Sequence, residues 1–416
     1  MKWTSNQANI IRARNCNLLV SAAAGSGKTA VLVERIIQMI CDSDSPINID
    51  ELLVVTFTKA AATQMKDKIR QAIEQRLLDF PDDKHLQKQI YLLNQANILT
   101  IDSFCFQVIK ENFHVVGIDP SIRVGETGEI ELLKADVLET VIEEAYENDG
   151  NFVMFADAFG GDKNDETIEK YITKIYDVSS SFPRPFEWTK QARKQLEVQS
   201  EEEFMQLAFV KDYFAQTGSI LKTIREKITA VLELARMPDG PAFMEKALLS
   251  DVEYVDSLIS AGNYSMLHDG TEHKFANIGR GKAGTFDPEI ADRIKETREN
   301  YKKELKQILK LFALPFDVVL SQIQEQKGML QAVLCITDKF REKFMEEKRR
   351  HNILEFSDVE HLALDILCEG YDEEGNPVPS RIGEEMADGF YEIMIDEYQD
   401  TNDLQEEFIS LISQHN

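Results

Sequence analysis

A short glycine-rich segment near the N-terminus has the residue types needed to bind phosphate groups. It lies between an apolar run and a helical pattern and reads Ala22-Ala23-Ala24-Gly25-Ser26-Gly27-Lys28-Thr29. Glycines let backbone N–H groups converge on phosphate oxygens, and a helix that begins here points its positive end at them. Lys28 would reach the β- and γ-phosphates of ATP, and the Thr29 hydroxyl would ligate Mg²⁺. The strict form of this loop has glycine where Ala22 stands, so a chance glycine-rich turn is the alternative.

An acidic pair late in the sequence could supply the second half of such a site. The apolar run Ile393-Met394-Ile395 ends in Asp396-Glu397. Asp396 would hold Mg²⁺ through water, and Glu397 would orient or deprotonate an attacking water molecule. Acidic residues after an apolar strand are common, so the pair indicates a nucleotide site only together with the glycine-rich loop. We predict Lys28 and Glu397 as the catalytic residues.

Alternating strands and helices are expected to position these groups. Apolar runs predict strands at 17–20, 52–57, 98–101 and 391–395, and helical spacing predicts helices at 29–40, 59–78, 104–113 and 357–368. A polar loop is expected at 370–379. This order predicts an α/β fold with a parallel sheet and right-handed crossovers, the architecture of a P-loop NTPase.

The middle of the chain has a different character. From about residue 129 to 351 the patterns are helical with almost no strand signal. The predicted organisation is a sheet domain that is interrupted by a mostly helical insertion: 1–120 for the first part, 121–350 for the insertion and 351–416 for the return. A loop with Lys274, Phe275, Arg280 and Lys282 lies in the insertion. It suits a solvated loop, with a clamp on duplex DNA as the alternative.

The charge of the chain is uneven. There are 46 Lys and Arg against 73 Asp and Glu, a net charge of −27. This argues against a histone-like coat and against docking on an anionic membrane, although a local basic groove remains compatible with nucleic acid. Residues 1–120 hold 13 basic and 13 acidic side chains, whereas 351–416 hold one basic and 18 acidic. The N-terminal part is therefore free to face an anion.

Cysteine usage and hydropathy indicate the cellular compartment of the protein. The five cysteines are widely spread and form no CxxC pair or Cys/His cluster. A disulfide framework or zinc site is not expected. The N-terminus has no apolar leader, and no run of 18 apolar residues occurs. A reduced, cytoplasmic protein without a membrane partner is the expectation.

The string around the acidic pair resembles a known family. Asp396-Glu397-Tyr398-Gln399-Asp400-Thr401-Asn402 looks like motif II of the UvrD/Rep-type superfamily 1A helicases. In that family alanine at position 22 is usual, which favours the phosphate-loop interpretation. Thr4-Ser5-Asn6-Gln7 resembles the family's Q motif, in which the glutamine reads the adenine edge. The resemblance implies a RecA-like motor domain that binds ATP and Mg²⁺, with Gln7 as a nucleotide contact.

Two further strings resemble the family's DNA-contact motifs. The segment 53–62, LVVTFTKAAA, is similar to motif Ia, and TIDSFC at 100–105 resembles the next motif. From these we predict DNA contacts at Phe57, Thr58, Lys59, Ser103 and Phe104. A core aromatic is the alternative for Phe57. Asp102 stands where histidine is frequent, and we expect it to cap a helix because an anion beside phosphate is unfavourable.

The phosphate loop and the segment EFSDVEHLAL at 355–364 look closest to AddA-type subunits of bacterial helicase–nucleases. That resemblance implies a 3′ to 5′ DNA helicase that processes double-strand breaks, single-stranded and duplex DNA as substrates, and an AddB-like partner. It also implies a second motor domain and a nuclease outside these 416 residues, so we expect poor ATP turnover by this chain alone. A UvrD/Rep-like helicase without a nuclease and a DNA-binding scaffold with an inert motor remain the alternatives.

Overall fold

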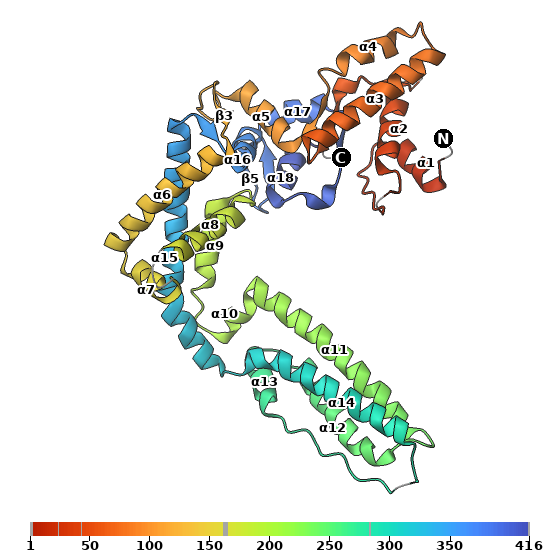
Figure 1. Ribbon diagram of the computed structural model, residues 1–416, viewed down its shortest axis with the longest axis vertical. Coiled ribbons are helices and arrows are strands. Elements are labelled where there is room, and N and C mark those ends of the chain that lie inside the picture. Colours follow the sequence, from red (N-terminus) through yellow and green to blue (C-terminus); the bar gives the residue numbers. More distant parts are fainter. Residues whose placement is uncertain (1–2, 24, 43, 161–164, 283, 415–416) are drawn as a thin grey trace. The chain divides into compact units, whose positions relative to one another are not determined.

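The computed structural model describes residues 3–414 except Ala24, Ser43, 161–164 and Ala283. Two compact units are present (Figure 1). The first contains the residues up to Glu144, Ile172–Trp188 and the chain from Thr337 onward, and the second contains Ala145–Tyr171 and Thr189–Ile336. The unit boundaries fall within helices α6, α8, α9 and α15. The first unit thus includes segments between 121 and 350 that the sequence pattern places in the insertion.

The first unit is built from the sheet elements and the helices that cover them. Its elements are α1 (Ser5–Arg12), α2 (Lys28–Ile40), β1 (Leu52–Thr56), α3 (Lys59–Asp79), α4 (Lys84–Leu92), β2 (Asn97–Thr100), α5 (Ile101–Asn112), β3 (Arg123–Val124), β4 (Ile353–Leu354), α16 (Phe356–Leu367), β5 (Cys368–Tyr371), β6 (Pro377–Pro379), α17 (Arg381–Gly389), β7 (Glu392–Ile395) and α18 (Asp403–Leu411). Parts of α6 (Thr127–Asn148), α8 (Glu166–Ser180), α9 (Pro185–Gln195) and α15 (Phe316–Arg350) complete it.

A three-stranded parallel sheet with the order β2-β1-β7 forms the centre of this unit. All five residues of β1 are buried, and alternate side chains face opposite layers. Leu53 and Val55 pack with residues of α5, α16 and α18, whereas Leu52 and Val54 pack with residues of α2, α3 and α4. Burial on both faces explains the continuous apolar run in the sequence. The predicted α/β fold with a parallel sheet is confirmed.

Two predicted elements of this unit are wrong. Residues 17–20 do not form a strand, and the side chains of Leu18, Leu19 and Val20 are 44%, 78% and 39% exposed. No strand in the described part of the chain pairs with this segment. An apolar pattern does not form a strand without a neighbour that supplies backbone hydrogen bonds. The expected polar loop at 370–379 is instead an antiparallel hairpin of β5 and β6, whose turn contains Gly375 with φ +88°.

The second unit is helical within its described residues. Its elements are α7 (Gly150–Phe159), α10 (Glu201–Gln206), α11 (Ala208–Arg236), α12 (Glu245–Ile259), α13 (Tyr264–Asp269) and α14 (Pro288–Leu309). Helices α11, α12 and α14 pack on one another around a core that includes Leu221, Val255 and Tyr301. In that core the buried Arg298 of α14 donates two hydrogen bonds to Asp251 of α12, at 2.6 and 2.9 Å. The loop that precedes α14 carries Lys274, Arg280 and Lys282, all three of which are exposed.

Candidate nucleotide site and DNA-facing edge

The glycine-rich loop has a backbone that suits the binding of phosphate. Gly25 and Gly27 adopt φ of +78° and +86°, a region that residues with a Cβ rarely enter. Helix α2 begins at Lys28, directly after Gly27, and no described side chain caps its N-terminus. The first N–H groups of the helix are therefore available to an anion. Ala22, Ala23 and Ser26 are exposed, and Ala24 lies outside the described residues.

Gln7 lies against this loop. Thr4 caps α1 and forms a capping box with Gln7, whose side-chain oxygen accepts from the Thr4 N–H at 3.0 Å. The amide nitrogen of Gln7 then donates to the backbone oxygen of Ser26 at 3.2 Å. The first helix thus presents its glutamine at the loop, where the resemblance places an adenine contact.

The acidic pair meets the loop. Nζ of Lys28 lies 3.3 Å from both carboxylate oxygens of Glu397, although 369 positions separate the two residues. Gln399 donates a hydrogen bond to the same carboxylate. This hydrogen bond first, and then Lys28, hold the pKa of Glu397 below its usual value. Glu397 is consequently an ionised carboxylate at neutral pH, as a water-orienting group requires.

The backbone at Glu397 is unusual. Its φ of 56° and ψ of 43° place a glutamate in the left-handed region, which non-glycine residues seldom adopt and which is enriched at functional sites. The preceding residue is fixed to the sheet, because the N–H of Asp396 donates to the Val55 oxygen at 2.9 Å.

A buried ion pair that the motifs did not reveal holds the loop helix to the acidic strand. Arg35 of α2 donates to both carboxylate oxygens of Glu392 in β7, at 2.6 and 2.8 Å. Arg35 is 5% exposed and also donates to the Ile10 oxygen of α1. The available signal was a charged residue at a position of α2 whose neighbours Ile36 and Ile37 are buried. This clamp joins the helix that begins with Lys28 to the strand that ends two residues before Glu397.

The residues present fit Mg²⁺ and a nucleotide polyphosphate. Thr29 is the second residue of α2 and Asp396 directly follows β7, and both are partly buried. Hydroxyl and carboxylate oxygens are the ligands that Mg²⁺ prefers, together with water and phosphate. The described residues contain no cluster of three or more His, Cys, Asp or Glu able to hold a metal by themselves.

The predicted DNA residues follow neighbouring strands at one edge of the sheet. β1 and β2 run parallel with Thr56 opposite Thr100, so α3 and α5 begin side by side. Thr58 caps α3 and is exposed, as is Lys59, whereas Phe57 is partly buried. Ser103 is also partly buried, and its hydroxyl lies 2.8 Å from that of Thr100. Two helix N-termini and a lysine at one edge can bind a phosphate backbone.

Phe104 and Asp102 differ from the prediction. Phe104 is 1% exposed and packs on Phe390 and Phe408 at centroid distances of 5.9 and 5.8 Å. Its ring belongs to the core and has no face for a base, so the predicted DNA contact is wrong. The cap of α5 is Thr100, which accepts from the Ser103 N–H at 3.2 Å, and not Asp102. Asp102 lies in the first turn of that helix.

The sequence matches a known protein family over almost its whole length. Residues 3–416 match the N-terminal domain of the UvrD/REP helicases. The chain belongs to this family. No described helix is long and apolar enough for a membrane span.

Individual relatives carry a more specific name. A protein named as the A subunit of an ATP-dependent helicase/nuclease in Lachnoclostridium phytofermentans is 42% identical, over 99% of this chain and 30% of the relative. Proteins of the same name in Clostridium beijerinckii and Clostridium perfringens are each 36% identical, over 100% and 99% of this chain and 34% and 33% of the relative. The chain therefore spans about a third of the length of the curated relatives it matches.

Proposed function

We propose that this chain is the first motor domain of an ATP-dependent DNA helicase or translocase, within a helicase–nuclease that processes double-strand breaks. The observation that carries the proposal is the meeting of Lys28 and Glu397 at 3.3 Å, at the start of α2 and the end of β7. Family membership supports the motor, and the names of the relatives support the helicase–nuclease.

In the proposed reaction, the ammonium of Lys28 exchanges Glu397 for the β- and γ-phosphates of ATP. The N–H groups of α2 and of the loop Gly25–Gly27 bind the same phosphates, while Gln7 contacts the adenine. Glu397, released from Lys28 and still bonded to Gln399, orients the attacking water and takes its proton. Thr29 and Asp396 would hold Mg²⁺, which would neutralise phosphate charge when bound.

DNA is proposed to bind along the edge where α3 and α5 begin. Thr58, Lys59 and Ser103 would contact the phosphate backbone, and the partly buried Phe57 would offer an edge to a base. The 3′ to 5′ direction, an AddB-like partner and a nuclease elsewhere in the protein are proposed from the family resemblance. We likewise propose that the helical block within 121–350 is an insertion into the motor domain.

The test is DNA-stimulated ATP hydrolysis by the full-length protein that carries this chain, assembled with its partner. The wild type is expected to hydrolyse ATP faster with single-stranded DNA, and Lys28→Ala is expected to lose turnover by at least about a hundredfold. Lys84→Ala, which removes an exposed lysine at the start of α4, is the matched control and should hydrolyse normally. Full turnover by Lys28→Ala would contradict the site. A folded wild type without any hydrolysis would favour the inert DNA-binding scaffold.

A further inference from the structure

A buried carboxyl group, that of Glu360 in α16, lies where three helices of the first unit meet. Helix α16 packs on both α5 and α18. Glu360 is 7% exposed, and its Oε1 accepts a hydrogen bond of 2.6 Å from the side-chain amide of Gln405 in α18. Its carboxyl group also hydrogen-bonds that of Asp102, in the first turn of α5. Glu360 therefore joins α5 to α18. Neither the register of the strands nor the nucleotide motifs explain this link.

The contact between Asp102 and Glu360 requires a proton. Carboxylates only accept hydrogen bonds, so two carboxyl groups can bond only when one of them is protonated. The pKa of Glu360 is raised to about 7, because burial and then Asp102 raise it more than the hydrogen bond from Gln405 lowers it. Burial also raises the pKa of Asp102, against the effects of Glu360 and Lys59. Near neutral pH the pair holds one proton.

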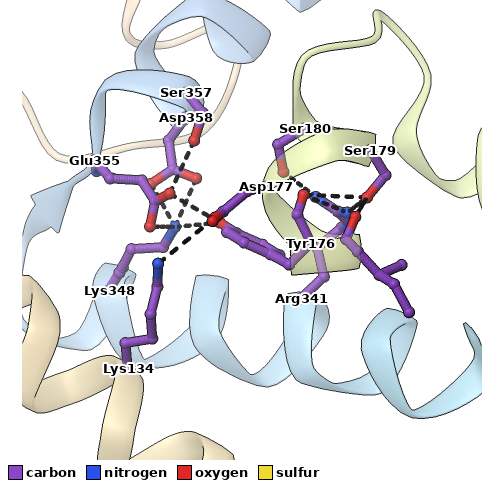
Figure 2. A network of polar contacts seen from close by, with 11 residues as sticks. Lys134, Tyr176, Asp177, Ser179, Ser180, Arg341, Lys348, Glu355, Ser357 and Asp358 are labelled. Atoms are coloured by element: carbon purple, nitrogen blue, oxygen red, sulfur yellow. Dashed lines mark hydrogen bonds and ion pairs between the residues drawn. The ribbon is translucent and has the colours of Figure 1, made fainter. Parts of the chain in front are cut away.

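Helix α16 presents Glu360 from a fixed position. Figure 2 shows the polar network at the start of this helix, where Lys348 lies between two acidic side chains. Nζ of Lys348, which is 1% exposed, lies 2.7 Å from an Asp358 oxygen and 3.1 Å from Glu355. These contacts fix the first turn of α16. When the contacts of Glu360 change, we therefore expect α5 and α18 to move relative to α16.

Both of those helices begin beside proposed functional residues. Asp102 directly precedes Ser103, at the DNA-facing edge. Gln405 forms the capping box of α18 with Asn402, six positions from Asp396. A cavity of about 230 Å³ reaches Glu360 and Asn402 and gives the pair access to solvent. The other ionisable groups around the pair are Cys105 of α5 and Lys59 of α3, with Tyr176, Asp177 and Glu355 on the cavity wall.

We propose that Glu360 is a positioning residue that shares one proton with Asp102 and, through Gln405, holds the DNA-facing turn of α5 in register with the segment after the acidic pair. This inference rests on the proposed function for its DNA-binding consequence. Loss of the proton places two carboxylates in contact, which separates α5 from α16 and weakens DNA binding.

The first experiment measures binding of a fluorescent single-stranded oligonucleotide to the full-length protein between pH 6 and pH 8.5. As the pH rises over this range, the dissociation constant of the wild type should rise at least about fivefold relative to that of Glu360→Gln. The amide of the variant mimics the protonated acid at every pH. Asp102→Asn, which also supplies a neutral donor, should be equally insensitive to pH. Glu369→Gln, an exposed glutamate of β5, is the matched control and should follow the wild type. Identical profiles for wild type and Glu360→Gln would overturn the positioning role.

The second experiment separates the carboxyl pair from the proposed function. Between the ordinary glutamate pKa and about pH 7, the native pair holds a proton that the unfolded chain has released. The stability of the protein should therefore fall as the pH rises through this range. The melting temperature of the wild type should therefore drop by about 5 °C relative to Glu360→Gln between pH 5.5 and pH 8.5. A constant difference would overturn the shared proton. Absence of DNA binding in the wild type would instead contradict the proposed function, and the melting comparison would still decide on the pair.

Discussion

Two ion pairs in this chain have similar chemistry and opposite surroundings. In the first unit, the side chains of Lys28 and Glu397 are 34% and 44% exposed. In the helical unit, those of Arg298 and Asp251 are 3% and 0% exposed, and Tyr301 donates a further hydrogen bond to Asp251 at 2.5 Å. The buried carboxylate has all its partners within the fold, whereas the exposed pair can exchange its partner for a ligand. Burial thus separates charges that hold the fold from charges that can do chemistry.

A third pair lies between these extremes. The side chains of Arg35 and Glu392 are 6% and 21% exposed, and their bidentate contact joins α2 to β7. Its burial indicates that it stabilises the fold. Its position indicates that it also affects function, because Lys28 begins α2 and Glu397 follows β7. The comparison predicts that the loss of stability grows with the burial of the pair that is broken, while ATP turnover depends on the exposed one.

The largest loss of stability is expected for Asp251→Ala. The change leaves the buried guanidinium of Arg298 without its carboxylate, which costs about 3–5 kcal/mol. Chemical denaturation followed by circular dichroism measures the effect. Asp256→Ala removes an exposed aspartate of the same helix, paired with the exposed Arg225, and should shift the melting temperature by less than about 2 °C. Equal effects of the two changes would contradict the ranking by burial.

Glu392→Gln should have the next largest effect. It removes the charge that compensates Arg35 but keeps one acceptor, so we expect a loss of about 2–3 kcal/mol. Because the clamp joins the helix that begins with Lys28 to the strand that precedes Glu397, we expect ATP turnover to fall as well. Glu34→Gln, on the same helix as Arg35 and paired more loosely with Arg76 at 3.6 Å, is the control. A variant with full stability and full turnover would show that the clamp is dispensable.

Tyr301→Phe should cost less. It removes one hydrogen bond to the charged Asp251 while Arg298 remains in place, and bonds of this kind contribute about 1.5–3 kcal/mol. The burial of Tyr301 and its bond to Asp251 raise its pKa well above the usual value, so the phenol remains a donor at all accessible pH. Denaturation midpoints in the same buffer measure the difference. A loss as large as that of Asp251→Ala would mean that the hydroxyl, and not the ion pair, dominates.

The smallest change in stability is expected for Lys28→Ala. Exposed ion pairs contribute little to folding, so its melting temperature should lie within about 2 °C of the wild type. Turnover should nevertheless be lost. Differential scanning fluorimetry beside the ATP hydrolysis assay measures both properties on one preparation. A large loss of stability would place Lys28 among the structural charges.

Local patterns carry the prediction of the nucleotide site. Gly25, Gly27 and Lys28 lie within four consecutive residues, and a strand-end carboxylate such as Glu397 can be found from the apolar run before it. The fold class followed from buried strands that alternate with helices. These features depend on short segments whose conformation is set by nearby residues.

Features that depend on distant partners were missed. The prediction of a DNA contact at Phe104 came from a motif alone. The burial of its ring depends on Phe390 and Phe408, which come from the far end of the chain. Arg35 and Glu392 are 357 positions apart, and no motif joins them. The apolar run at 17–20 suggested a strand, but a ladder needs a neighbour that the pattern itself does not name. Tertiary packing decides all three.

The exposed pair is the centre of this account, and Glu397→Gln in the full-length protein tests it most directly. The amide keeps the size of the side chain and can still accept from Gln399, but it cannot take a proton from water. We predict that nucleotide binding, measured with a fluorescent ATP analogue, stays within about threefold of the wild type. DNA-stimulated hydrolysis should fall about 10²–10⁴-fold. Hydrolysis at the wild-type rate by a variant that binds the nucleotide normally would contradict the role of Glu397.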